Sequence, residues 1–213
     1  QDTSVFGVKE AYDDGDADFH TIVAKMADIP RSAAKTINLG LFYGMGKAKL
    51  QAELGVSKDK AEELFNIYHS RVPFVKSLMR SVSNRAQQRG QIRTLLGRLC
   101  RFHLWEPNSF GMHKALPFDQ AVQEHGPGIK RAYTYKALNK LIQGSAADMT
   151  KKSMLELYKE GIVAHIQVHD ELDISVEDDK KAKRIKEIME SAVELEIPNK
   201  VDYEKGTNWG NIK

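Results

Sequence analysis

Apolar residues recur every three or four positions through most of the first half of the chain, which is the spacing of amphipathic helices. Leu64 and Tyr68, for example, fall on one such inner face. Pro30 suits a first helical position, Ser57 an N-cap and Gly90 a stop. The pattern predicts helices over residues 30–44, 47–54, 58–69 and 73–88.

Two β-hairpins are predicted in the second half, where β-branched residues lie between turn residues. The first covers residues 91–104 and turns at Leu96-Gly97-Arg98. The second has strands at residues 162–168 and 172–176, joined at His169-Asp170-Glu171. Because these strands are rich in Ile and Val, we expect them in the core of a sheet, with the three polar residues held at the tip.

Helices surround these hairpins in the prediction. Residues 130–160 predict a long helix interrupted near Gly144-Ser145, and residues 178–196 predict an amphipathic helix before a strand near residues 200–203. Residues 103–130 follow no sustained periodicity, so no regular element is predicted there. Helices around a small antiparallel sheet indicate the α+β class, with a helical part at residues 1–90 and a mixed part at residues 91–213.

The composition is that of a globular chain. Its 213 residues are 41% hydrophobic, enough for a core, and no apolar run approaches the roughly 20 residues that span a bilayer. We therefore expect no membrane partner and a cytoplasmic location. The single cysteine, Cys100, is interpreted as a packing residue and not as a zinc ligand.

A net charge of +3 conceals a strong polarity along the chain. Residues 20–103 hold 15 Lys and Arg against 5 Asp and Glu, whereas residues 160–204 hold 6 against 13. Residues 71–101 contain eight basic side chains and no acidic one. This pattern favours sequence-independent contact with phosphates in one region and cation binding in another.

The helix predicted at residues 30–44 carries a specific line of side chains. Arg31, Lys35, Leu39 and Tyr43 are four residues apart, so they lie on one face that is cationic at its start and apolar at its end. Two like charges at this spacing disfavour a helix slightly, which indicates an anion outside it. A solvated charged face is the alternative interpretation.

These residues carry a resemblance to a known family. Arg-x3-Lys-x3-Leu-x3-Tyr-Gly resembles motif B of the family A DNA polymerases, the polymerase I and phage replicase family. Val168-His169-Asp170-Glu171 resembles motif C of that family, and residues 143–148 (Gln-Gly-Ser-Ala-Ala-Asp) resemble the helix between the two motifs. The three motifs occur in the family's order, and the resemblance covers nearly the whole chain.

The resemblance implies template-dependent transfer of a nucleotide from a dNTP to a primer 3′-hydroxyl. Two Mg²⁺ ions, for which Mn²⁺ can substitute, would be held by Asp170 and Glu171, and His169 would lie at the primer end. Arg31, Lys35 and His20 would bind the triphosphate, and Lys35 would also protonate the leaving group. Asp170, Glu171, Lys35 and His169 are thus the predicted catalytic residues.

The same resemblance implies further contacts with the substrates. Leu39, where the family has Phe or Tyr, would lie next to the sugar, and Tyr43 would close over the new base pair. Gly44, Asn139, Gln143 and His169 would contact primer-template DNA. Tyr135 stands where the family has an arginine, one turn before Asn139.

The resemblance further implies a right-hand polymerase, with a fingers-like part at residues 1–90 and a palm-like part at residues 91–213. Relative to the bacterial members, residues 103–130 are predicted to be an insertion. Motif A and the thumb have no counterpart in the sequence. We expect an upstream or separate polypeptide to carry them, and a phage-encoded protein would work in the host cytoplasm or nucleoid. One alternative is a non-catalytic nucleic-acid-binding module, and another is a metal-dependent phosphohydrolase that uses His169 and Asp170.

Overall fold

The computed structural model describes residues 20–21, 24, 29–71, 73–109, 111 and 113–212. The chain divides into two compact units, the first comprising Gln1–Arg93 and Gly97–Leu141 and the second Thr94–Leu96 and Ile142–Lys213. Residues 1–19 lie outside the described ones. No helix within the described ranges has the length and apolar character needed to cross a membrane.

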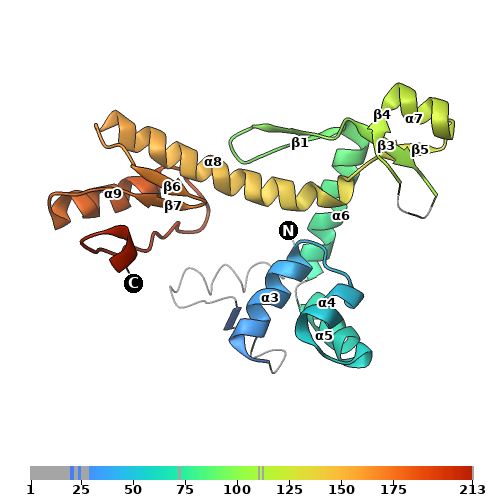
Figure 1. Ribbon diagram of the computed structural model, residues 1–213, viewed down its shortest axis with the longest axis horizontal. Helices are drawn as coiled ribbons and strands as arrows, with labels where there is room; N and C mark the ends of the chain where they lie inside the picture. Colours follow the sequence, from blue (N-terminus) through green and yellow to red (C-terminus); the bar gives the residue numbers. More distant parts are fainter. Residues whose placement is uncertain are drawn as a thin grey trace. The chain divides into compact units, whose positions relative to one another are not determined.

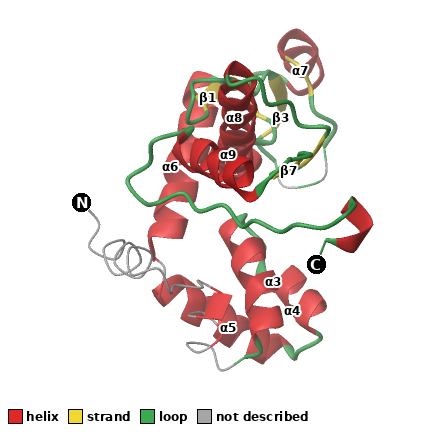
Figure 2. Cartoon of the chain, turned by 90° about the vertical axis from the view of Figure 1, so that its left-hand side faces the viewer, coloured by secondary structure: helices red, strands yellow, loops and turns green. Residues whose placement is uncertain are grey.

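The helices predicted in the first half of the chain are confirmed. They are α3 (Arg31–Phe42), α4 (Lys47–Leu54), α5 (Lys58–Arg71) and α6 (Pro73–Arg89), with α3, α4 and α5 side by side in Figures 1 and 2. The Ser57 hydroxyl accepts the N–H of Lys60 at 3.2 Å and so caps α5 as expected. Pro30 is the N-cap of α3 and not its first helical residue, because its ψ of 145° is extended.

One apolar core holds these helices together. Its buried members are contributed by residue 24 and by helices α3 to α6: Ala24, Ala34, Ile37, Leu41, Leu50, Leu64, Tyr68 and Val75. Each fully buried aliphatic side chain of this kind contributes about 1.5 to 3 kcal/mol. The Tyr68 hydroxyl is enclosed and has no hydrogen-bond partner among the described residues, and burial raises the pKa of Tyr68 to about 12.

The predicted first hairpin is confirmed. Strands β1 (Gln91–Arg93) and β2 (Leu99–Arg101) pair antiparallel, with Ile92 opposite Cys100. Gly90 ends α6 with a φ of +66° and turns the chain directly into β1. The free Cys100 is half-buried in β2, in keeping with a packing role.

The segment predicted as an insertion is an ordered layer. Strands β4 (Leu116–Pro117), β3 (Leu104–Pro107) and β5 (Ile129–Arg131) form an antiparallel sheet in that order, beside helix α7 (Phe118–His125) (Figure 1). These strands have two to four residues each, too short to show a period in the sequence.

Arg131 joins this layer to α6 and to the first hairpin. Its guanidinium donates to the carbonyl of Gln87 at 3.2 Å and to that of Phe102 at 3.0 Å. The same group lies 4.4 Å from the centre of the Trp105 ring. A side chain at Gly90 would meet this guanidinium, because an added Cβ would lie 2.7 Å from its Cζ.

The long helix departs from the prediction at its start and in its middle. After β5, a 3₁₀ turn η2 (Thr134–Lys136) leads into α8 (Ala137–Lys159), so the helix begins seven residues later than predicted. It runs unbroken through Gly144, since one glycine costs only about 1 kcal/mol in a helix. The Ser145 hydroxyl accepts the N–H of Leu95 at 2.9 Å, which attaches the loop of the first hairpin to α8.

The second unit packs a short hairpin and a helix against α8. Strands β6 (Ile166–Val168) and β7 (Glu171–Asp173) pair antiparallel as predicted, and α9 (Asp179–Ser191) begins at an Asp178 cap. Leu157, Ile162, Ile185 and Ile188 form the buried core of this unit.

Two predictions for the end of the chain are wrong. Helix α9 ends at Ser191, five residues early, and residues 200–203 form no strand. In place of strand pairing, the N–H of Val201 donates to the Glu190 carboxylate at 2.9 Å, and Lys205 pairs with Asp179 at 2.9 Å. Side chains of α9 thus hold this segment before the 3₁₀ turn η3 (Trp209–Asn211).

We expect Gly90→Ala to destabilise the protein more than Gly55→Ala. Both glycines have positive φ, at +66° and +63°, so alanine is strained at either position. Nothing in the described part of the chain lies within 4 Å of a Cβ at residue 55, whereas at residue 90 the anchored Arg131 guanidinium must move. The difference should be about 1 to 3 kcal/mol, the range for a hydrogen bond to a charged group. Urea denaturation of both variants measures it, and equal losses would contradict the role assigned to Arg131.

A pH dependence is expected from His69. Burial, and then the nearby Lys76 ammonium, hold the pKa of His69 below its usual 6.5. The unfolded chain therefore takes up this proton at a higher pH than the folded chain, so stability should fall as the pH drops through 6.5 and level off below the folded-state pKa. Thermal unfolding from pH 8 to pH 5 should show a smaller fall for His69→Phe, with the exposed His103→Phe as control. Parallel curves for the wild type and His69→Phe would contradict this expectation.

Candidate active site

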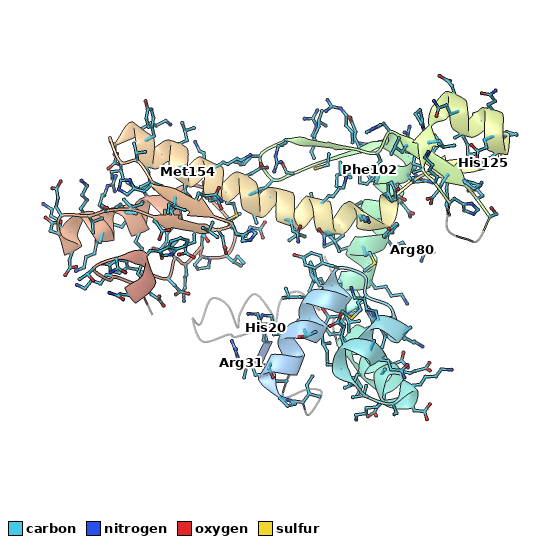
Figure 3. All side chains as sticks on the ribbon, viewed as in Figure 1. His20, Arg31, Arg80, Phe102, His125 and Met154 are labelled. Atoms are coloured by element: carbon cyan, nitrogen blue, oxygen red, sulfur yellow. The ribbon has the colours of Figure 1, made fainter. Side chains whose placement is uncertain are left out.

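Helix α3 has two faces with different environments. Ala34, Ile37 and Leu41 are buried in the core, with at most 1% of each side chain exposed. At 100° per residue, Arg31, Lys35 and Leu39 lie on the other side of the helix, and all three are exposed. Leu39 is 46% exposed although it is apolar, so packing within the chain does not explain it. Figure 3 labels Arg31 at the start of this helix.

The end of α3 is fixed by its backbone. The N–H of Met45 donates to the Gly40 carbonyl at 2.8 Å, and the N–H of Gly44 donates to the Leu41 carbonyl at 3.1 Å. This pair of bonds, with Gly44 at a φ of +88°, is a Schellman C-cap. Gly40 lies within the helix, and the Met45 side chain packs over it. Tyr43 is the half-buried C-cap residue of this turn.

A buried amide on α3 contacts His20. The Nδ2 of Asn38 lies 3.1 Å from the Nδ1 of His20, and only 3% of Asn38 is exposed. His20, which is half-buried, therefore lies beside the helix that carries Arg31 and Lys35 (Figure 3). Sequence reasoning missed Asn38, although a polar residue on the apolar side of an amphipathic helix was a readable signal.

The tip of the second hairpin holds a strained residue. His169 and Asp170 form a two-residue loop between the paired Val168 and Glu171, and His169 has a φ of +53°. A non-glycine residue in this region costs about 1 to 3 kcal/mol and is typical of functional sites. The Gln167 side-chain amide donates to the His169 carbonyl and helps to hold the turn. The carboxylates of Asp170 and Glu171 are exposed.

The hairpin does not lie in a sheet core, and that prediction is wrong. Leu172 and Ile174 pack against the apolar core of the second unit. The opposite face carries the cross-strand pairs Ile166 with Asp173 and Val168 with Glu171. Ile166 is 43% exposed and Val168 36% exposed, so this face of the hairpin is largely uncovered within the described residues.

Asn139 and Gln143 lie one turn apart on α8, with Asn139 half-buried and Gln143 exposed. Neither side-chain amide makes a hydrogen bond within the described part of the chain. Internal hydrogen bonding within the described residues therefore does not account for these two amides.

The basic residues of the first unit are at the surface. Helix α6 exposes Lys76, Arg80, Arg85 and Arg89, and the first hairpin exposes Arg93, Arg98 and Arg101 (Figure 3 labels Arg80). The Arg93 guanidinium also donates to the Gly97 carbonyl at 2.9 Å across the turn. The side chain of Arg71, the eighth basic residue, lies outside the described ones.

Comparison with known proteins identifies the family. The model of DNA polymerase family A matches residues 7–211. The chain belongs to this family.

Its relatives are phage and bacterial polymerases. The DNA-directed DNA polymerase of Pseudomonas phage M6 is 33% identical over 93% of this chain, and DNA polymerase I of Bacillus caldotenax is 32% identical over 86%. The chain spans 32% of the phage relative's length and 20% of the bacterial relative's.

A solved structure is similar as well. The POL domain of Pol1 from M. smegmatis, in complex with DNA primer-template and dNTP, matches with a TM-score of 0.69 and 28% identity, over 90% of this chain and 34% of that one. The predicted α+β class and the resemblance to the family A polymerases are thereby confirmed.

Within this family A chain, the predicted site residues fall into two sets. Arg31, Lys35 and Leu39 belong to the first unit, and Asp170 and Glu171 belong to the second. Carboxylates are the donors that Mg²⁺ prefers, so Asp170 and Glu171 fit a divalent cation in kind. They do not fit it in number, because the described residues contain no group of three or more His, Cys, Asp or Glu side chains able to hold a metal.

Proposed function

We propose that the chain is part of a DNA-directed DNA polymerase and that it binds the incoming dNTP and the primer terminus during template-dependent nucleotidyl transfer. The observation that carries this proposal is the exposed Arg31, Lys35 and Leu39 face of α3 in a chain of DNA polymerase family A. The similar POL domain, whose structure holds primer-template DNA and a dNTP, supports the same substrates.

In this proposal α3 binds the nucleotide. Arg31 and Lys35 neutralise the triphosphate, and the Lys35 ammonium gives a proton to the departing pyrophosphate. His20 contacts a phosphate, and its neighbour Asn38 orients the imidazole. The exposed Leu39 lies against the sugar, and Tyr43 closes over the nascent base pair.

The hairpin of the second unit binds the primer end. His169 contacts the terminal nucleotide. Asn139, Gln143 and the backbone of Gly44 are each assigned to contacts with primer-template DNA. Asp170 and Glu171 would supply two of the carboxylates for divalent cations, Mg²⁺ or Mn²⁺; such cations would neutralise phosphate charge and increase the acidity of a hydroxyl. Residues 1–90 are the fingers-like part and residues 91–213 the palm-like part.

A further segment completes the site. The hairpin tip supplies two carboxylates, Asp170 and Glu171, and the hairpin face with Ile166 and Val168 is largely uncovered within the described residues. An upstream or separate polypeptide with motif A and the thumb would cover this face and add a carboxylate. We place the assembled enzyme in the cytoplasm, with the DNA and nucleotides that it uses.

In the assembled polymerase, Arg31→Ala and Lys35→Ala should each lower kcat/KM for dNTP by roughly a hundredfold, as expected when one transition-state contact is lost. The affinity for primer-template should change by less than about threefold, because both charges face the triphosphate. Single-turnover kinetics and a DNA titration measure the two effects. The matched control is Lys49→Ala, an exposed lysine on α4. Equal losses in DNA affinity and in kcat/KM for dNTP would contradict the assignment of Arg31 and Lys35 to the triphosphate.

We expect the 213-residue chain alone to extend a labelled primer at no more than about a thousandth of the rate of its mixture with the complementing polypeptide. Two cations need bridging carboxylates from more than one strand, and the hairpin tip offers only Asp170 and Glu171. Asp170→Asn should abolish the activity of the mixture, whereas Asp202→Asn, an exposed acid of the same unit, should not. Robust synthesis by the chain alone would show that other carboxylates complete the site.

A further inference from the structure

Hydrogen bonds to its backbone hold the segment between β5 and α8 in place. The N–H of Ala132 donates to the Leu104 carbonyl at 2.8 Å, and the Ser83 hydroxyl donates to the Thr134 carbonyl at 3.0 Å. Ala137, at the start of α8, is fully buried. The side chains of this segment are therefore presented from a rigid support.

Two tyrosine rings are exposed on that support. Tyr135 is 65% exposed and Tyr133 39% exposed. Tyr133 also has a φ of +61°, which costs an L-residue about 1 to 2 kcal/mol. Neither apolar burial nor an unstrained backbone accounts for an aromatic residue at this position, and such an outlier points to a function outside the fold.

One lysine lies between the two rings. The Lys136 ammonium is 5.0 Å from the centre of the Tyr133 ring and 5.6 Å from that of Tyr135. Each contact is a cation–π interaction, which orders the rings while the exposed charge stays available to an anion. One turn further, the Lys140 ammonium lies 5.0 Å from the Phe102 ring, which Figure 3 labels.

The surrounding sequence favours an anionic ligand. Residues 125–147 contain no Asp or Glu, and their basic residues are Lys130, Arg131, Lys136 and Lys140. Exposed aromatic rings beside basic side chains are the combination that binds single-stranded nucleic acid, in which the bases stack on the rings and the cations contact phosphates.

We propose that Tyr133, Tyr135 and Lys136 form a stacking site for an unpaired nucleotide of a DNA single strand. The base stacks on a tyrosine ring, and the Lys136 ammonium contacts the adjacent phosphate. Base faces in a duplex are covered by their neighbours, so a ring of this kind is suited to an unpaired or terminal base and not to the interior of paired DNA. The inference rests on the proposed function in taking DNA as the partner.

The test compares three fluorescein-labelled DNA probes of equal length with the whole chain: a thymidine oligonucleotide, an oligonucleotide of abasic residues, and a blunt duplex. Fluorescence anisotropy gives the Kd of each. Tyr135→Ala should weaken binding of the thymidine strand at least about fivefold, the lower range for one base–aromatic stack, and leave the other two probes within about twofold. Tyr135→Phe should bind like the wild type.

Tyr158→Ala is the matched control. Tyr158 is on α8 and is 67% exposed, and no lysine or arginine lies over its ring among the described residues. Its loss should leave all three affinities unchanged. A second variant separates ligand binding from folding: Tyr133→Gly relieves the positive φ, so it should raise the Tm while it weakens binding of the thymidine strand.

Several results would overturn the proposal. If a tyrosine variant loses equal affinity for the thymidine and abasic strands, the contact is with phosphate alone. If it loses equal affinity for the duplex, the contact is with a groove. Unchanged affinity in both tyrosine variants would also contradict the proposal. A fall in both Tm and affinity for Tyr133→Gly would show a structural role. If the wild type binds all three probes but the tyrosine variants match Tyr158→Ala, only the stacking site fails; if the wild type binds none of them, the proposed function fails as well.

Discussion

Much of the first unit depends on the contacts that the Arg131 guanidinium makes. It bonds to a carbonyl at the end of α6 and to one just after β2, and it stacks on Trp105 of β3. An arginine can do this because its planar group offers several donors at its edge while its face stacks on an aromatic ring. A lysine in its place would lose the stacking and one of the two directed bonds. The contact also requires Gly90, since any side chain there would occupy the same space.

The anchored Arg131 also determines the position of the next residues in the chain. Tyr133 comes two residues later with a positive φ, and α8 begins four residues after that. Backbone strain of this kind persists only where the surroundings determine the conformation, and here the buried Ala132 and Ala137 on either side do so. His169, the other described non-glycine residue with positive φ, is held by hairpin pairing and by the Gln167 amide. In both places the protein uses its own contacts to present exposed polar or aromatic side chains.

The sequence predicted the elements with long, regular patterns. Helices α3 to α6 have enough turns for the apolar period to show, and their boundaries coincide with Pro30, Ser57, Pro73 and Gly90. Both hairpins were also found, because glycine and polar residues separate their strands. The start of α8 was missed because β5 and η2, which precede it directly, are only three residues long each and show no period in the sequence.

Contacts between distant segments were not readable in the same way. The bond from Leu95 to Ser145 joins residues fifty apart, and the cation–π contact of Arg131 depends on a sheet that the sequence did not reveal. For the candidate site, the line of Arg31, Lys35 and Leu39 and the Asp170-Glu171 pair were predicted from spacing and resemblance, and the structure shows these side chains exposed. The strain at His169 and the contact between Asn38 and His20 became evident only in three dimensions.

A segment that covered the open face of the hairpin would affect both its apolar side chains and its exposed carboxylates. Asp170 and Glu171 are exposed, and water screens a charge–charge interaction at 4 Å to about 1 kcal/mol, so two solvated carboxylates hold a divalent cation only weakly. A segment that covers Ile166 and Val168 would remove water from the same face, lower the local dielectric constant and strengthen the attraction of Glu171 for a cation. It would also relieve the cost of leaving two β-branched side chains in water. Apolar burial and cation binding should therefore be coupled, so that the covering segment binds more tightly with Mg²⁺ than without it. Val168→Ser, which removes apolar surface without adding a carboxylate, should weaken binding of the segment and of the cation.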